Sequence, residues 1–252
     1  MRRYVIILMA VMFLLPGMSA RAQTEGGKFQ EANAYYRASD FSKAAQLYQE
    51  LVREYPRVAV FYYDLGNANV KLGEKSEAIL AYEKALRLAP RDRDIRHNLN
   101  YVRGQLEYRV EDNRNWYLKA TDAVLARFTE REIKFSALVF IFIFLVSGMV
   151  YFLFRQRVFW GGGRKFLFVL ALIFIALAVW KHVQGNMMND AIVMAKECEA
   201  RYGPSEHDQV AFRMGEGIKV VVMDRREDWS RVLLTNGESG WVRNSDIAEV
   251  KV

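Results

Sequence analysis

The residue types that carry out most enzyme chemistry are scarce in this chain of 252 residues. Its three histidines, His97, His182 and His207, fall in separate segments and match no spacing typical of a metal or nucleophile site. The single cysteine, Cys198, excludes an internal disulfide and any site built from several thiolates. Its neighbours carry no signature of an activated thiolate. The sequence therefore predicts no catalytic residue, no metal site and no cofactor.

Two polar pairs have a spacing that suits binding rather than catalysis. Asn33 precedes Arg37, and Asn67 precedes Lys71, by four residues, which is one turn of a helix. Each pair offers amide and cationic donors that fit a peptide carboxylate or an acidic side chain. We take these four residues as candidate partner-binding residues. The alternative is that they are solvated polar residues on an exposed helix face.

The two pairs belong to a repeated unit. When the chain is shifted by 34 residues, 28–57 aligns with 62–91 with eight identities in thirty positions. Small residues, tyrosines and prolines recur at equivalent places, as in Ala44/Ala78, Tyr48/Tyr82 and Pro56/Pro90. Gly66 and Ala32 are equivalent small residues that would let two helices touch. A period of 34 with this pattern resembles the tetratricopeptide repeat.

That resemblance implies a helical array over 27–110, with a third helix at 94–109 capping the stack. Leu99 takes the next repeat position after Leu65 in this register. The first helices of such units line a concave surface, where the two polar pairs resemble part of a carboxylate clamp. Asp94 and Asn98 on the third helix do not complete that clamp. We expect another polypeptide to dock on this surface.

The beginning of the chain resembles a secretory signal. Arg2 and Arg3 precede an apolar stretch, and 20–22 offers an A-x-A cleavage site. The interpretation is a signal peptide over 1–22, and the alternative is an uncleaved anchor. The segment after it is expected outside the cytoplasm.

Two further apolar runs predict a membrane hairpin. The run at 135–154 has 20 uncharged residues, enough for a bilayer, and a second span is predicted at 166–184. The loop 155–165 carries four basic residues and no acid, which predicts a cytoplasmic loop with both soluble parts in the periplasm. The segment 111–134 is expected to be an amphipathic linker, lying against either the membrane or the repeat array.

The segment 189–252 has short β-branched and aromatic runs separated by turn signals, among them Asn236-Gly237. This predicts a small β-barrel, and its motifs resemble bacterial SH3-like domains, which often bind cell-wall peptide or protein. Three aromatic residues, Tyr202, Trp229 and Trp241, are a possible binding patch. The favoured alternative is that such tryptophans form the core of so small a barrel.

The predicted fold is therefore multidomain: an α-helical tetratricopeptide array, a two-helix transmembrane hairpin and an all-β SH3-like barrel. This order is similar to BatE-type proteins of bacterial aerotolerance (Bat) operons. The resemblance implies a non-catalytic inner-membrane adaptor, with von Willebrand factor A-domain membrane proteins and, indirectly, a MoxR-type AAA+ ATPase as partners. The alternative is a cell-envelope sensing module whose barrel binds peptidoglycan or peptide. The net charge of +7 is spread among acids, so no nucleic-acid partner is expected.

Overall fold

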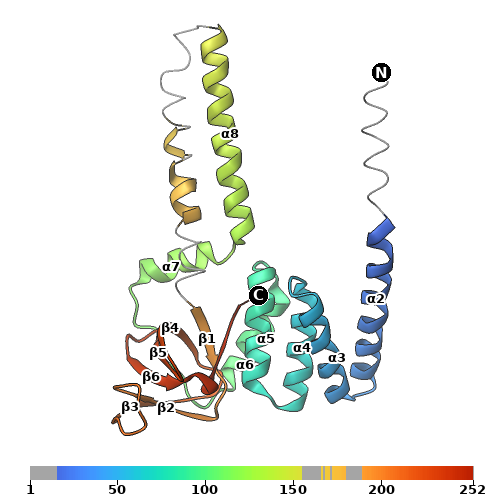
Figure 1. Cartoon of the computed structure of the whole chain (residues 1–252), viewed down its shortest axis with the longest axis vertical. Helices are drawn as coiled ribbons and strands as arrows, with labels where there is room; N and C mark the ends of the chain where they lie inside the picture. Colours follow the sequence, from blue (N-terminus) through green and yellow to red (C-terminus); the bar gives the residue numbers. More distant parts are fainter. Residues whose placement is uncertain (1–15, 155–165, 167, 171, 180–188, 252) are drawn as a thin grey trace.

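The structure is a computed structural model that describes residues 16–154, 166, 168–170, 172–179 and 189–251. A helical array and a small β-sheet domain lie side by side, and a long helix extends away from both (Figure 1). The α-helical and all-β parts of the predicted fold are thus confirmed. The predicted cleavage site falls inside the first described helix, and residues 1–15 lie outside the described residues, so the signal peptide stays a prediction.

The array consists of paired helices that follow the predicted repeat. Apolar and small residues of both units are buried at equivalent positions, among them Ala44 and Ala78 as well as Tyr48 and Tyr82. Both turns inside the units contain a residue with positive φ, Ser39 at 62° and Gly73 at 83°, and these positions are also 34 residues apart. The helices are α2 (Pro16–Arg37), α3 (Phe41–Glu54), α4 (Ala59–Leu72), α5 (Lys75–Leu88) and α6 (Arg93–Gly104).

A close approach between α4 and α5 explains the glycine in the second unit. A methyl group added at Gly66 would lie 2.6 Å from Cε1 of Tyr82, which is nearer than carbon atoms pack. The first unit has Ala32 at the same position, and that alanine is fully buried. The prediction that small residues let the helices of a unit touch is therefore confirmed.

The third helix, α6, packs on α5 at the end of the array. It buries Ile95, Leu99 and Val102, which agrees with its predicted capping role. Its carboxyl end is Gly104 rather than residue 109. The chain then turns towards the barrel, where the Tyr108 ring lies against Gly215.

The barrel domain is one antiparallel sheet with the strand order β3-β2-β6-β5-β4-β1-β7. Gly237, with φ of 95°, lies in the tight β5–β6 connection that Asn236-Gly237 predicts. The strands β2 and β7 were not predicted, because β2 carries three charged residues in five and β7 is only three residues long. The strands are β1 (Asn189–Val193), β2 (Glu197–Arg201), β3 (Val210–Gly215), β4 (Lys219–Arg226), β5 (Trp229–Leu233), β6 (Ser239–Arg243) and β7 (Ile247–Glu249), and a 3₁₀ turn, η1 (Asn244–Asp246), precedes β7.

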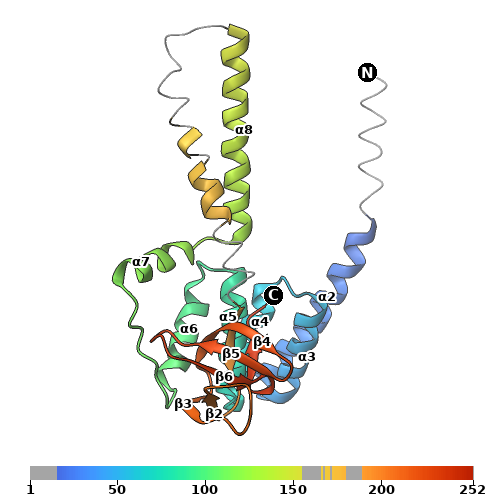
Figure 2. The ribbon, with the colours of Figure 1, turned by 60° about the vertical axis from the view of Figure 1, so that its left-hand side comes forward.

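The barrel packs against the α5–α6 end of the array, as Figures 1 and 2 show. Ile192 on β1 and Val250 beside β7 are buried in the same apolar cluster as the helical repeats. Gly217 approaches Ile79 and Leu106 so closely that an added methyl group would lie 2.8 Å from each. The two domains therefore share one continuous core at their boundary.

The predicted transmembrane hairpin is wrong. A crossing needs about 20 consecutive apolar residues, and no helix among the described residues combines the necessary length with the necessary apolar composition. In helix α8 (Glu130–Phe154), the described side chains run from 132 to 146 and include Glu132 and Lys134. Residues 155–165 lie outside the described residues, as does part of 166–184.

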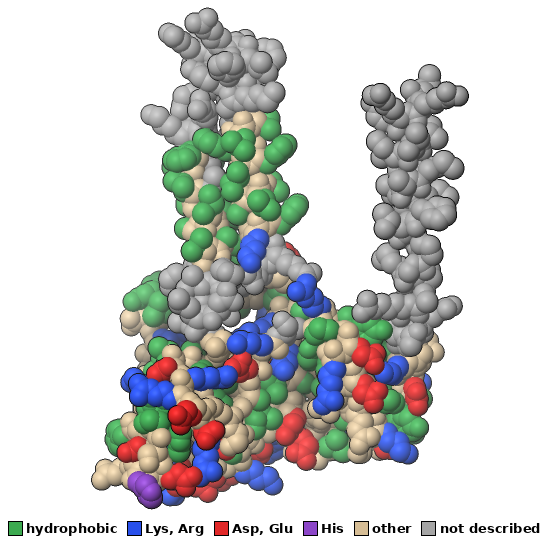
Figure 3. All heavy atoms as spheres, viewed as in Figure 1, with side chains coloured by type: hydrophobic (Ala, Val, Ile, Leu, Met, Phe, Trp, Pro, Cys, Tyr) green, Lys and Arg blue, Asp and Glu red, His purple; other side chains and the backbone are tan. Residues whose placement is uncertain are grey.

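What the structure does describe there is a pair of apolar segments in mutual contact. The rings of Phe140 and Phe174 stack with centroids 4.4 Å apart, and Phe144 lies 5.4 Å from Phe168. Hydrophobic side chains cover the visible surface of α8 (Figure 3). At the base of α8, Glu132 forms an ion pair of 3.0 Å with Arg91 of the array.

The linker 111–134 contains the predicted amphipathic helix as α7 (Trp116–Leu125). None of the residues of α7 is buried, and Trp116 is 79% exposed. Ion pairs within the linker connect α7 to the segment before it: Arg114 lies 2.8 Å from Asp112 and 2.6 Å from Asp122 of α7. The described part of the repeat array therefore does not bury α7, although Arg91 of the array contacts Phe128 and Glu132 further along the linker.

Candidate functional site

Asn33 and Asn67 occupy equivalent positions on α2 and α4. Each amide oxygen accepts a hydrogen bond from the tyrosine of its own unit: the Tyr48 hydroxyl lies 2.6 Å from Asn33 Oδ1, and the Tyr82 hydroxyl lies 2.7 Å from Asn67 Oδ1. The tyrosine rings are buried, so their hydroxyls need a partner inside the protein. The two asparagines thus connect the first helix of each unit to the second.

The third helix extends this polar network. The Asn98 amide nitrogen donates to Asn67 Oδ1 at 3.0 Å and to the Tyr63 hydroxyl at 3.2 Å. The Asn67 amide nitrogen in turn donates to the Asp64 carboxylate at 3.4 Å. Both ends of the Asn67 side chain are therefore used within the array. We use the name groove for a set of residues on α2, α4 and α6, the helices that are expected to line the concave side of the array. The set is Asn33, Tyr36, Tyr63, Asp64, Asn67 and Asn98, together with the exposed Arg37, Lys71 and Tyr101.

The predicted cations stand at the surface of the groove. Arg37 ends α2 and Lys71 lies in the last turn of α4, and both side chains are exposed. Neither forms a hydrogen bond or an ion pair within the described parts of the chain. Arg37 and Lys71 can therefore pair with groups on a partner. The side chains of Asn33 and Asn67, by contrast, already form hydrogen bonds within the array.

Asp64 is a groove residue that sequence reasoning missed. It is half-buried, and this burial raises the pKa of its carboxyl to about 6, although the Asn67 hydrogen bond acts in the opposite direction. Burial also raises the pKa of Tyr48 and of Tyr82, to which the nearby Asp64 charge adds. The repeat pattern gave no signal for Asp64, since its counterpart one unit earlier is Gln30.

The three aromatic residues of the predicted barrel patch differ in exposure. Trp241 is only 7% exposed, and the Arg226 guanidinium covers its ring at 5.3 Å from the centroid. Trp229 is half-buried on the neighbouring strand, while Tyr202 is 72% exposed. Tyr202 is the member of the three that presents most of its surface to a ligand.

A group of charged residues joins the array to the barrel. Lys219 of β4 lies 3.3 Å from Glu83 of α5 and 2.9 Å from Asp190 of β1, and Arg87 lies 2.8 Å from the same Asp190. Arg103 of α6 also pairs with Glu83, whose side chain is only 8% exposed. We call these five residues the interdomain ion cluster.

The cluster is arranged so that its charges stabilise one another. Burial alone would raise the pKa of Asp190, but Lys219 and Arg87 outweigh it and lower that pKa. Burial likewise favours a neutral Lys219, but Glu83 and Asp190 outweigh this effect and raise its pKa. Both groups are therefore charged at neutral pH, and the array and the barrel are held at a fixed orientation.

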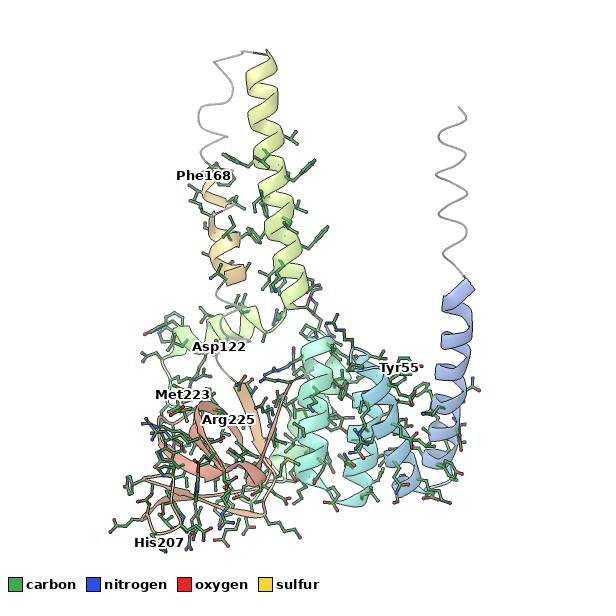
Figure 4. All side chains as sticks on the ribbon, viewed as in Figure 1. Tyr55, Asp122, Phe168, His207, Met223 and Arg225 are labelled. Atoms are coloured by element: carbon green, nitrogen blue, oxygen red, sulfur yellow. The ribbon has the colours of Figure 1, made fainter. Side chains whose placement is uncertain are left out.

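The residues that could take part in enzyme chemistry are separated in the structure. His97 lies on α6, whereas His207 lies at the end of the barrel remote from α8 (Figure 4), and His182 falls outside the described residues. Cys198 is buried in the barrel, and this burial raises the pKa of its thiol to about 12. Within the described ranges, no three His, Cys, Asp or Glu side chains are grouped to hold a metal ion.

The fold is a helical-repeat array joined to a small barrel. Comparison with protein families agrees: residues 29–93 match the tetratricopeptide repeat, and residues 195–249 match the bacterial SH3 domain. The chain therefore contains both domains that the sequence predicts. No curated protein matches it, so the further resemblance to BatE-type proteins stays a prediction. Tetratricopeptide repeats are typical of protein–protein interaction, and bacterial SH3 domains of peptide or peptidoglycan binding.

Proposed function

We propose that this protein is a non-catalytic adaptor whose groove binds a segment of another polypeptide. The observation that carries the proposal is the arrangement on α2, α4 and α6. Exposed Arg37, Lys71 and Tyr101 stand beside a network that fixes Asn33, Asn67 and Asn98 in place. A rigid polar surface with projecting side chains suits an extended peptide, because little of the surface has to be ordered on binding.

The interdomain ion cluster supports an adaptor rather than two independent binding modules. Two contacts connect the array to the barrel over more than one hundred positions: Lys219 contacts Glu83, and Asp190 contacts Arg87. A ligand on the barrel would thus be held at a fixed distance from a polypeptide in the groove. Two ligands held in this way raise each other's effective concentration.

A non-catalytic role is supported by the chemistry of the described groups. Burial keeps Cys198 protonated, and the described histidines lie in different domains. The von Willebrand factor A-domain proteins and the MoxR-type ATPase implied by the Bat resemblance are the first candidate partners to test. A location outside the cytoplasm is part of the proposal and is supported by the signal-like segment alone.

Photo-crosslinking in cells tests this proposal. A benzophenone side chain placed at Tyr101, which is 60% exposed in the groove, should form an adduct with one defined protein. The same group placed at exposed Lys43 on α3 serves as the control position. Replacing Arg37 and Lys71 by alanine should reduce the Tyr101 adduct several-fold, because these changes remove exposed charges without affecting buried contacts.

Identical adducts from positions 101 and 43, or an adduct that is insensitive to the double replacement, would count against the groove.

The match to a bacterial SH3 domain supports a second candidate function, the cell-envelope module. It would be favoured if the purified full chain sediments with peptidoglycan and loses this property on Tyr202→Ala.

A further inference from the structure

Asp64 is a carboxylate without a cationic partner among the described residues. Its hydrogen bond from Asn67 is long, at 3.4 Å, and no lysine or arginine forms an ion pair with it in the described ranges. Elsewhere in the array, buried acids do have such partners: Glu83 contacts both Arg103 and Lys219. Burying a carboxylate without a cation opposes folding, so this arrangement calls for an explanation.

Aromatic rings from four helices gather within electrostatic range of Asp64. They are Tyr36 on α2, Tyr48 on α3, Tyr63 on α4 and Tyr82 on α5. The Asp64 charge contributes to the raised pKa of Tyr36, Tyr48 and Tyr82, and the rings of Tyr63 and Tyr82 have centroids 6.0 Å apart.

These phenols do not neutralise the carboxylate. The hydroxyls of Tyr48 and Tyr82 donate to Asn33 and Asn67, and the Tyr63 hydroxyl accepts from Asn98. The rings of Tyr48 and Tyr82 are buried, so the aromatic surface beside the Asp64 charge comes from the partly exposed Tyr36 and Tyr63. That combination attracts a cation, because the faces of aromatic rings carry negative electrostatic potential.

The same network argues against a carboxylate at this point. One N–H of the Asn67 amide donates to Asp64 and the amide oxygen accepts from Tyr82 and Asn98, so this side chain is held with its nitrogen towards a carboxylate of the protein itself. An anion placed here would also face Asp64 itself. Arg37, whose charge also acts on Tyr48, and Lys71 are exposed and remain available for acidic groups that flank the cation.

From this geometry we infer that the groove recognises a lysine or arginine side chain of the bound polypeptide, whose cationic end pairs with Asp64 beside the partly exposed rings of Tyr36 and Tyr63. The inference rests on the proposed function and adds the chemical class of the ligand. A charge-assisted hydrogen bond in a partly buried site contributes about 1.5–3 kcal/mol, which corresponds to about tenfold or more in affinity.

A random dodecapeptide library displayed against the purified full-length protein provides the probe. Lysine or arginine should be enriched at one position of the selected peptides. A synthetic peptide with that residue should bind about tenfold more weakly when it is replaced by norleucine or, for a lysine, acetyl-lysine. These peptide changes leave the protein untouched and so do not depend on the folding of a variant.

The matched protein variants are Asp64→Asn and Glu74→Gln. Both remove one negative charge, but Glu74 is exposed before α5 and its side chain makes no capping hydrogen bond. Asp64→Asn should weaken the selected peptide about tenfold, whereas Glu74→Gln should leave its affinity unchanged.

The outcomes separate the two proposals. Enrichment of acidic residues, or peptide binding that is indifferent to Asp64→Asn, would overturn the cation site and leave a peptide-binding groove. Failure to enrich any peptide would overturn both proposals. The cation site would be supported by two results together. Asp64→Asn weakens binding of the peptide while Glu74→Gln does not, and acetylation or norleucine replacement of the basic residue in the peptide also weakens binding.

Discussion

At the scale of single residues, Asp64 is a carboxyl group whose ionised form opposes folding, although it belongs to the groove that we propose binds a partner. Its pKa in the folded protein is about 6 against an ordinary value of 3.8, mainly because of burial. The unfolded chain therefore loses this proton at a lower pH than the folded chain does. The stability that the protonated Asp64 contributes is fully present below the unfolded pKa of 3.8. It is lost as the pH rises from there through the folded pKa of about 6.

Asp64→Asn should accordingly stabilise the protein at pH 8 and change little at pH 4. The difference between the two pKa values corresponds to about 3 kcal/mol, and partial exposure of the side chain reduces this to about 1–2 kcal/mol. Urea unfolding at both pH values measures the effect. A variant that is less stable than the natural protein at pH 8 would show that the Asp64 carboxylate is stabilising as it stands.

At the scale of elements, the distance between α4 and α5 depends on the absence of a side chain at Gly66. Gly66→Ala places a methyl group 2.6 Å from Tyr82 Cε1. Overpacking of this kind costs about 1–3 kcal/mol, and the helix preference of alanine returns about 1 kcal/mol. We therefore expect a net loss of up to about 2 kcal/mol in the free energy of unfolding.

The control for this element is Gly104→Ala at the end of α6. A methyl group there would meet nothing within 4 Å, so its effect should be neutral or slightly stabilising. Thermal unfolding of both variants separates a packing effect from a simple preference for alanine. Equal melting temperatures for the two would contradict the close helix contact.

At the scale of the whole molecule, the interdomain ion cluster adds charge contacts to the apolar boundary between the array and the barrel. Lys219→Met would leave Glu83 with Arg103 and Asp190 with Arg87 and would remove the one cation that contacts both acids. Removing a member of a partly buried cluster costs more than removing a surface pair. We expect a loss of about 1–2 kcal/mol, measured by chemical unfolding.

Lys251→Met is the matched control, because Lys251 is exposed and pairs only with Glu249 among the described residues, at 2.8 Å. Its loss should change stability by less than about 0.5 kcal/mol. Faster proteolysis of the 105–113 connection in Lys219→Met but not in Lys251→Met would locate the effect at the domain boundary. Identical behaviour of the two variants would mean that the cluster contributes nothing beyond surface pairs.

The sequence by itself determined the two domains and much of their interiors. The period of 34 located Gly66, Tyr48 and Tyr82, because the geometry of a helix pair imposes the same size at the same place in every unit. It also located Asn33 and Asn67, although it assigned them to a partner rather than to the tyrosines. Short β-branched and aromatic runs and the Asn236-Gly237 turn likewise predicted most of the barrel.

Only the tertiary structure decided how these parts are used. Lys219 and Glu83 are 136 residues apart, and no periodicity links two residues that meet because domains dock. Asp64 stands outside the repeat pattern, because its counterpart one unit earlier is Gln30 and its burial depends on how the helices pack. The membrane hairpin was predicted from composition alone, and the helices described do not support it. Local patterns reflect the geometry of one element, whereas charge partners and burial depend on which elements pack together.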